Sequence, residues 1–124
     1  MVSATRFRLA APRFDPDESY LARRCKVLLA RRGYWVIRQH AGKALTLDRR
    51  RVIYLGEEGV PDYAVLHARH RNFLLELKRE RGGRLSDMQE NKIAEIRQFY
   101  KLPIAVVDTV EDLRGWLEIH ERAP

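Results

Sequence analysis

Residues 59–89 read GVPDYAVLHARHRNFLLELKRERGGRLSDMQ, and the rest of the predicted fold is arranged around them. The apolar run Phe73–Lys78 is bounded by polar residues and by an Arg/Gly-rich loop, which predicts a buried strand. Side chains alternate along a strand, so Glu76 and Lys78 should share one face. Burying two charges is costly unless they form a pair or serve a site. Asp62, at the start of another predicted strand, is placed to lie beside them.

The residues before this stretch predict a helix, a strand and a hairpin. Asp15 and Glu18 have the spacing of a capping box, which predicts Asp15 as the N-cap and Pro16 as the first helical residue. Gly33 is suited to end the helix. Four apolar residues at helical spacing form its predicted buried stripe: Leu21, Cys25, Leu28 and Leu29. The segments that follow are a strand over 34–39, a turn at 41–42, a hairpin from 44–47 and 51–55, and a strand over 63–68.

The residues after it predict a second helix, a strand and a last helix. Ser86 and Gln89 form another capping box, which begins a helix over 86–100. The predicted apolar stripe of this helix is Ile93, Ile96 and either Phe99 or Tyr100. A short buried strand covers 104–107, and Asp108 or Thr109 caps a helix that ends near Glu121.

This order of elements predicts an α/β fold, a small mixed sheet flanked by helices with an inserted β-hairpin. Strand, helix and strand from residue 73 to 107 should form a parallel crossover. We expect residues 15–124 to form a single domain and residues 1–14 to form a basic N-terminal arm.

The composition is that of a globular protein, because 45% of the 124 residues are hydrophobic. No apolar run approaches the roughly 18 residues that a membrane span needs. Cys25 is the only cysteine, which excludes an intramolecular disulfide and a cysteine-based zinc cluster. We therefore expect a cytoplasmic or nucleoid-associated protein.

The positive charge is concentrated in the first half of the chain. The formal net charge is +7, and residues 1–60 hold 13 of the 24 Lys and Arg residues but only 6 of the 17 Asp and Glu residues. A one-sided basic surface favours a polyanion such as nucleic acid, although a merely soluble surface would have the same composition. The arginines expected to contact phosphates are Arg23, Arg49, Arg50, Arg51, Arg79, Arg81 and Arg84.

An acid, a second acid and a lysine at one end of a sheet have the chemistry of a site for Mg²⁺ or Mn²⁺. These ions prefer oxygen ligands, and Asp62 and Glu76 are the first candidates. The main-chain carbonyl of Leu77 is a natural third ligand. Lys78 would hold a water or offset charge on a phosphate.

Pro61-Asp62, Glu76-Leu77-Lys78 and Gln89, in this order, resemble the PD-(D/E)xK nuclease superfamily. Gly-Val-Pro-Asp, Leu-Glu-Leu-Lys, a Gly-rich turn, Leu-Ser-Asp-x-Gln and a late Val-Val-Asp are similar to its VRR-NUC branch, over roughly residues 17–110. The resemblance implies a restriction-endonuclease-like αβββαβ core and a metal-dependent endodeoxyribonuclease. It also implies catalytic roles for Asp62, Glu76, Lys78 and Gln89, with Glu18 as an extra metal ligand.

Each of these assignments has a structural alternative. Helix capping alone explains Gln89 and Glu18, and a buried ion pair would explain Glu76 with Lys78. His67 and His70 are expected to be plain turn residues rather than metal ligands.

The resemblance further implies branched DNA, such as four-way junctions or flaps, as the substrate. Because one such site cuts one strand, we expect a homodimer, with the 44–55 hairpin or the last helix at its interface. The alternative function is a non-catalytic nucleic-acid-binding module with the nuclease fold.

Overall fold

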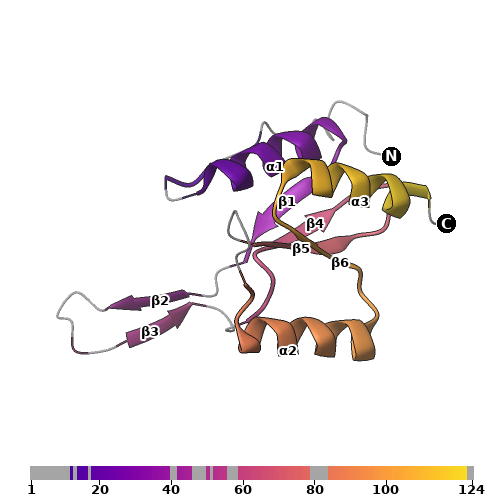
Figure 1. Ribbon diagram of the computed structural model, residues 1–124. Coiled ribbons are helices and arrows are strands. Elements are labelled where there is room, and N and C mark those ends of the chain that lie inside the picture. The colour runs from indigo at the N-terminus through magenta and orange to yellow at the C-terminus, as the bar shows by residue number, and fades with distance from the viewer. Residues whose placement is uncertain are drawn as a thin grey trace, which may run out of the picture.

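The computed structural model describes residues 12, 14–16, 18–39, 42–45, 50, 52–55, 59–78 and 84–122, and all structural statements below refer to these residues. The elements are α1 (Tyr20–Arg31), β1 (Trp35–Arg38), β2 (Gly42–Leu45), β3 (Val52–Leu55), β4 (Tyr63–Leu66), β5 (Phe73–Leu77), α2 (Asp87–Glu95), a π-helical segment (Ile96–Tyr100), β6 (Ile104–Val107) and α3 (Val110–Arg122). Their order follows the prediction (Figure 1).

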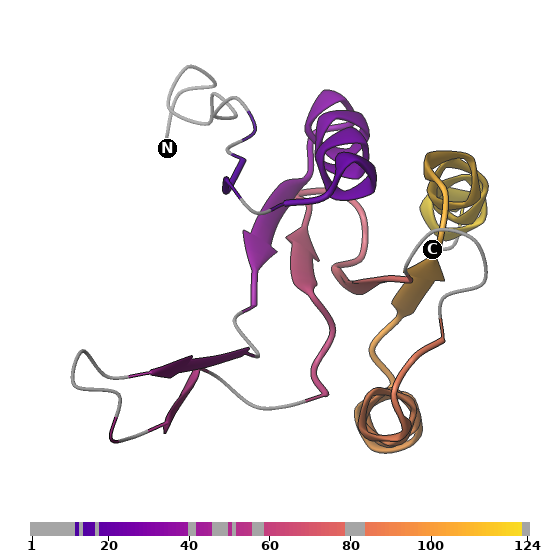
Figure 2. The same cartoon turned by 60° about the vertical axis from the view of Figure 1, so that its left-hand side comes forward.

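The protein has a mixed α/β fold built on a four-stranded sheet with the strand order β1-β4-β5-β6. β4 pairs antiparallel with both β1 and β5, whereas β5 and β6 are parallel and are connected through α2. α1 and α3 cover one face of the sheet, and α2 lies on the other (Figure 2). The expected parallel crossover from β5 to β6 is confirmed.

The hydrophobic core lies between the sheet and the α1/α3 layer. Alternate strand residues point into it, as strand geometry requires. Its buried sheet residues are Tyr63, Val65, Phe73, Leu75, Ala105 and Val107, and its helical residues include Leu21, Cys25, Leu29, Leu113 and Leu117. By alternation, Glu76 belongs to the opposite face, which α2 covers.

α1 begins at Tyr20, four residues later than the predicted first helical residue, Pro16. Ser19 is its N-cap, and the Ser19 hydroxyl accepts the Ala22 N–H at 3.1 Å. Asp15 and Glu18 still form half of a capping box, because Glu18 Oε1 accepts the Asp15 N–H at 2.7 Å. That contact closes a separate turn before the helix. The prediction that Gly33 ends the helix is confirmed, since Gly33 has a φ of 87°.

The start of the second helix is predicted correctly, but its apolar stripe is not. Ser86 is the N-cap of α2, and Gln89 completes the capping box. Ile93 is buried, whereas Phe99 and Tyr100 are exposed by 69% and 74%. The π-helical hydrogen bonding of residues 96–100 changes the helical period, so a stripe extrapolated from Ile93 at 3.6 residues per turn does not hold there.

The inserted hairpin is present as a separate two-stranded sheet, in which β2 and β3 pair from Gly42↔Leu55 to Leu45↔Val52. Gly42 begins β2, so the predicted turn at 41–42 does not include it. The hairpin projects away from the four-stranded sheet (Figure 1). The N-terminal arm lies outside the described residues except for Pro12 and Phe14. None of the described helices is long and apolar enough to cross a bilayer.

Candidate functional site

Two carboxylates from neighbouring strands lie in contact, one directly before β4 and one within β5. Glu76 Oε2 accepts the main-chain N–H of Asp62 at 3.0 Å. Asp62 Oδ2 in turn accepts the main-chain N–H of Leu77 at 2.9 Å. Each side chain is therefore held by the backbone of the other strand. The predicted juxtaposition of Asp62 and Glu76 is present.

The backbone around Asp62 is anchored on both sides. Gln39, directly after β1, donates its main-chain N–H to the Asp62 carbonyl at 2.7 Å and its Nε2 to the Pro61 carbonyl at 2.9 Å. Gly59 has a φ of 84°, and a Cβ on this residue would lie 2.8 Å from the carbonyl oxygen of Met88. A glycine is thus required where the chain passes the first turn of α2.

Gln89 is both a helix cap and a member of the carboxylate site. Its Oε1 accepts the Ser86 N–H at 2.8 Å, which closes the capping box. Its Nε2 donates to Glu76 Oε1 at 2.7 Å. The two alternatives for this residue are compatible, because opposite ends of one amide perform them.

The environment of the pair favours a proton on it. Glu76 is only 1% exposed, and burial together with the neighbouring Asp62 charge raises the pKa of Glu76 from 4.5 to about 8. Burial also raises the pKa of Asp62, although the Leu77 N–H and the Arg38 charge oppose this effect. At neutral pH the two acids share a proton unless a cation replaces it.

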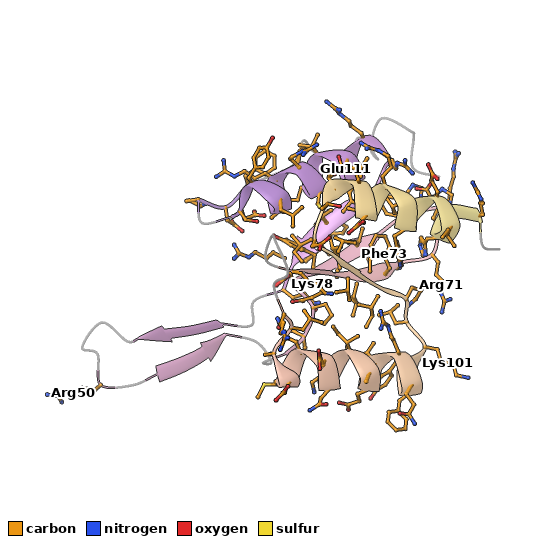
Figure 3. The ribbon with its side chains drawn as sticks, in the orientation of Figure 1. Arg50, Arg71, Phe73, Lys78, Lys101 and Glu111 are labelled. Atoms are coloured by element: carbon orange, nitrogen blue, oxygen red, sulfur yellow. The ribbon has the colours of Figure 1, made fainter. Side chains whose placement is uncertain are left out.

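Lys78 follows β5, and its main-chain N–H donates to the Val107 carbonyl at 2.8 Å, so the parallel pairing with β6 continues to this point (Figure 3). The register places Lys78 beside Asp108. A side-chain hydrogen bond with Asp112 raises the pKa of Asp108, and the Lys78 charge lowers it. Among the described residues, Lys78 forms no ion pair within 4.0 Å. Its ammonium is therefore not committed to a structural pair with Glu76.

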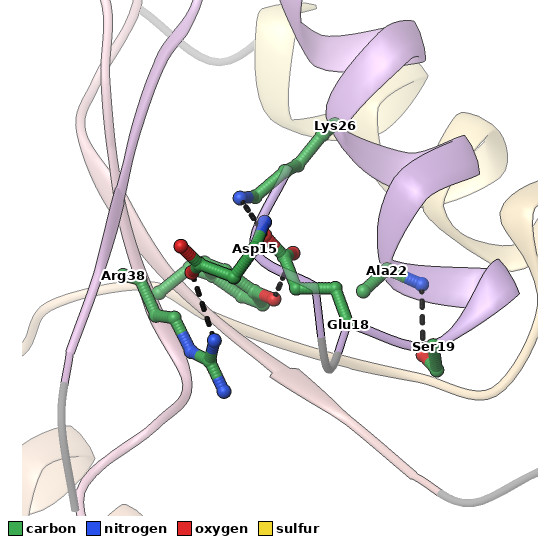
Figure 4. A network of polar contacts seen from close by, with 7 residues as sticks. Asp15, Glu18, Ser19, Ala22, Lys26 and Arg38 are labelled. Atoms are coloured by element: carbon green, nitrogen blue, oxygen red, sulfur yellow. Dashed lines mark hydrogen bonds and ion pairs between the residues drawn. The ribbon is translucent and has the colours of Figure 1, made fainter. Parts of the chain in front are cut away.

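Glu18 lies in a different polar network, at the start of α1 (Figure 4). Its carboxylate accepts hydrogen bonds from Lys26 Nζ at 2.5 Å, from the Tyr63 hydroxyl at 2.8 Å and from the Asp15 N–H. Burial raises the pKa of Glu18, but the hydrogen bonds from Asp15, Lys26 and Tyr63 outweigh this effect and lower it. The structure does not join Glu18 to the Asp62–Glu76 pair, and its role as a metal ligand stays a prediction.

The predicted phosphate-binding arginines are described only in part. Arg23, Arg50 and Arg84 are exposed, and Arg50 lies far from the sheet, beside the hairpin (Figure 3). The other four lie outside the described residues: Arg49, Arg51, Arg79 and Arg81.

Two residues near the site were not predicted from the sequence. Arg38, the last residue of β1, pairs with Asp15 at 2.8 Å and acts on Asp62 through its charge. Asp108 directly follows β6, and the Lys78 charge acts on its carboxyl. Arg38 carries no motif signal, whereas Asp108 could have been found from the parallel crossover, which places the ends of β5 and β6 together.

The prediction that His67 and His70 lie at the turn between β4 and β5 is confirmed. His67 Nδ1 accepts the N–H groups of Arg69 and His70, at 2.9 and 3.1 Å, and Nε2 lies 3.0 Å from the Arg32 carbonyl. Both nitrogens of His67 are thus used within the fold.

The donor set at Asp62 and Glu76 fits Mg²⁺ or Mn²⁺. Both ions prefer carboxylate oxygens, and a cation between two buried acids would replace the proton that they now share. The described residues contain no group of three or more His, Cys, Asp or Glu side chains suited to a metal, so main-chain oxygen or water would have to complete the coordination.

Comparison of the chain with protein-family models, with curated proteins and with solved structures finds no match.

Proposed function

We propose that this protein is a metal-dependent endonuclease that hydrolyses DNA phosphodiester bonds. The observation that carries the proposal is the contact between the half-buried Asp62 and the buried Glu76, which Gln89 supports and in which burial raises the pKa of both carboxyls. A protein that keeps two acids in contact bears a free-energy cost, and such costs are typical of functional sites.

The fold supports this proposal through its topology. The order of elements agrees with the αβββαβ core that we expect of a restriction-endonuclease-like nuclease, with the hairpin as an insertion. Asp62, Glu76 and Gln89 also stand in the order of the VRR-NUC pattern. We propose membership of that branch on these two grounds.

The residues of the site would have three roles: metal binding, orientation of water or phosphate, and positioning of a ligand. Asp62, Glu76 and the main-chain carbonyl of Leu77 would hold Mg²⁺ or Mn²⁺, which when bound lowers the pKa of a water and stabilises charge on the phosphate. Lys78 would orient the attacking water or neutralise a phosphate oxygen, because its ammonium forms no ion pair within 4.0 Å with the described acids. Gln89 would keep the Glu76 carboxylate in place through its Nε2 donor.

The choice of DNA rests on the net charge of +7 and on the family resemblance. A branched DNA and a homodimer are part of the proposal, because a two-fold pair of sites would cut two strands symmetrically. Sedimentation or light scattering at micromolar concentration would test the dimer.

The activity is tested by incubating the protein with labelled duplex, single-stranded, flap and four-way-junction DNA in Mg²⁺, Mn²⁺ or EDTA. We expect strand breaks that need the metal and are most frequent on a branched substrate. Glu76→Gln and Lys78→Met should each reduce cleavage by about 10²-fold or more, because charge stabilisation at the reacting phosphate is lost.

Arg114→Ala is the matched control, because it removes an exposed charge on α3, which covers the face of the sheet opposite to α2 and Glu76. This variant should cut like the parent. If the parent binds DNA but makes no strand breaks with either metal, the protein is the non-catalytic module. If Glu76→Gln and Lys78→Met cut like the parent, the proposed site is wrong.

A further inference from the structure

The C-terminal end of the α2 layer exposes two adjacent aromatic side chains. Phe99 and Tyr100 are exposed by 69% and 74%, although aromatic residues in helices usually pack against the protein. They lie in the π-helical segment 96–100, and such segments are frequent at functional sites. Both rings therefore present apolar surface that the described part of the fold leaves exposed.

The surroundings of these rings are basic. Arg97 and Lys101 lie within two residues of Phe99, and the segment 96–101 contains no acid. Arg71 joins them from the chain before β5, because its Nη2 donates to the Lys101 carbonyl at 2.7 Å. Figure 3 shows Arg71 and Lys101 at the same end of the molecule, away from Lys78. Exposed aromatic rings among cations are the pattern of a surface that stacks bases and attracts phosphates.

The same surface is held firmly in place. Arg97 Nη2 donates to the Ile104 carbonyl at 3.0 Å, which ties the π-helical segment to β6. Lys101 has a φ of 53° and, among the described residues, is the one non-glycine with a positive φ. The Arg71 hydrogen bond to its carbonyl holds the chain where it leaves the segment. A segment whose backbone is already held loses less conformational entropy when it binds a ligand.

The helix sets the distance from the rings to the candidate site. Gln89 at one end of α2 contacts Glu76, and Tyr100 lies eleven residues further along. At 1.5 Å per residue the separation is about 17 Å, which corresponds to about five nucleotides at 3.4 Å each. One nucleic acid strand could therefore reach both.

We propose that Phe99 and Tyr100, with Lys101 and Arg71, form a stacking platform for unpaired bases of a nucleic acid strand. The inference rests on the proposed function for the nature of the polymer and extends it by assigning a single-stranded segment about five nucleotides from the site. The positive charge around the rings favours nucleic acid over an apolar protein partner.

The test is binding in EDTA, where no cleavage occurs, of fluorescein-labelled 12-nucleotide oligo(dT) and of a 12-base-pair duplex. We expect Phe99→Ala/Tyr100→Ala to bind the single strand about tenfold or more weakly, because stacking contributes about 1–3 kcal/mol per base. Its affinity for the duplex should change less than twofold, and Phe99→Trp should bind the single strand as tightly as the parent. Lys101→Ala should weaken binding and reduce the salt dependence by about one counterion.

Ile119→Ala is the matched control, since Ile119 is 72% exposed but lies on α3, on the opposite side of the sheet. It should leave both affinities unchanged. The platform is refuted if the double variant binds the single strand like the parent, if it loses affinity for both DNAs equally, or if its main change is a lower oligomeric mass. If the platform is refuted but the parent still cleaves DNA with a metal, the proposed nuclease function stands. If the double variant loses single-strand binding as expected but the parent does not cleave, only the nuclease function is refuted.

Discussion

Glu76 and Glu18 are two buried glutamates whose surroundings differ in one respect. Glu76 is 1% exposed and Glu18 is 8% exposed, and both accept hydrogen bonds on each carboxylate oxygen. Glu18 faces the Lys26 ammonium, and its pKa is lowered. Glu76 faces the Asp62 carboxyl, and its pKa is raised to about 8. In the part of the chain that the structure describes, Glu18 has a cationic partner in contact with its carboxylate, and Glu76 does not.

This difference separates a structural acid from a candidate functional one. Burial of a charge is tolerated when an opposite charge repays the lost hydration, as Lys26 does for Glu18. At Glu76 a bound proton compensates for the lost hydration at neutral pH, and a divalent cation could compensate for it better. The sequence resemblance assigned both residues to a metal, and their neighbours distinguish them.

The largest expected difference is in folding stability. Glu18→Gln should lower the free energy of unfolding by about 3 kcal/mol or more, because it leaves the Lys26 ammonium buried without its counterion. Glu76→Gln should raise the free energy of unfolding at pH 7, because the folded carboxyl there keeps a proton that the unfolded chain releases. Urea denaturation of both variants measures the difference. Equal losses would mean that the two acids have equivalent surroundings.

The pH dependence of stability should have opposite signs at the two acids. The pKa of Glu76 is about 8 in the folded chain and about 4.5 when unfolded, so the folded state binds the extra proton between these values. Stability from this group is therefore present at low pH and falls by up to about 1.4 kcal/mol per unit as the pH rises toward 8. Glu18 has a lowered pKa, so its contribution is present above pH 4.5 and is lost in acid.

Thermal unfolding between pH 5 and 8.5, with EDTA, checks this prediction. The parent minus Glu76→Gln difference should decrease toward pH 8, and Mg²⁺ should restore stability there but not at pH 5. A difference that is flat with pH would refute the shared proton.

Gln89 can be tested separately as a cap and as a support of Glu76. Gln89→Glu keeps an acceptor for the Ser86 N–H but places a carboxylate where Nε2 now donates to Glu76. Cleavage should fall about 10–100-fold, as for other groups that orient a metal ligand. Ser86→Ala removes the cap, costs about 1 kcal/mol of stability and should reduce cleavage much less. The reverse ranking in cleavage assays would make Gln89 a cap only.

The smallest expected effect is at Asp108, the neighbour of Lys78. Asp108→Asn removes a negative charge close to the ammonium, which should alter cleavage by only a few fold and change its pH profile. Asp108→Glu should restore the parental profile. A loss as large as that of Lys78→Met would place Asp108 among the catalytic residues instead.

Local signals in the sequence predicted most of the fold. The strand 104–107 and the capping box of Ser86 and Gln89 depend on residues close in sequence, and both are found as predicted. The predicted start of α1 was wrong because two overlapping cap signals compete there, and Ser19 rather than Asp15 is the N-cap. The prediction that Phe99 or Tyr100 belongs to the apolar stripe was wrong, because the change to π-helical hydrogen bonding has no marker in the sequence.

The carboxylate pair was also predictable, because alternation along β5 and the position of Asp62 before β4 suffice to bring them together. The second role of Gln89 and the separate network of Glu18 were not predictable. Both depend on how α1 and α2 pack against opposite faces of the sheet, which local spacing does not determine.

Calorimetric titration of the protein with Mn²⁺ at pH 7, in two buffers of different ionisation enthalpy, tests the Asp62–Glu76 site most directly. We predict that the parent and Glu18→Gln bind a cation and release about one proton, and that Glu76→Gln does not bind it. Absence of binding to the parent, or binding that is lost in Glu18→Gln and kept in Glu76→Gln, would contradict the assignment of this pair as the metal site.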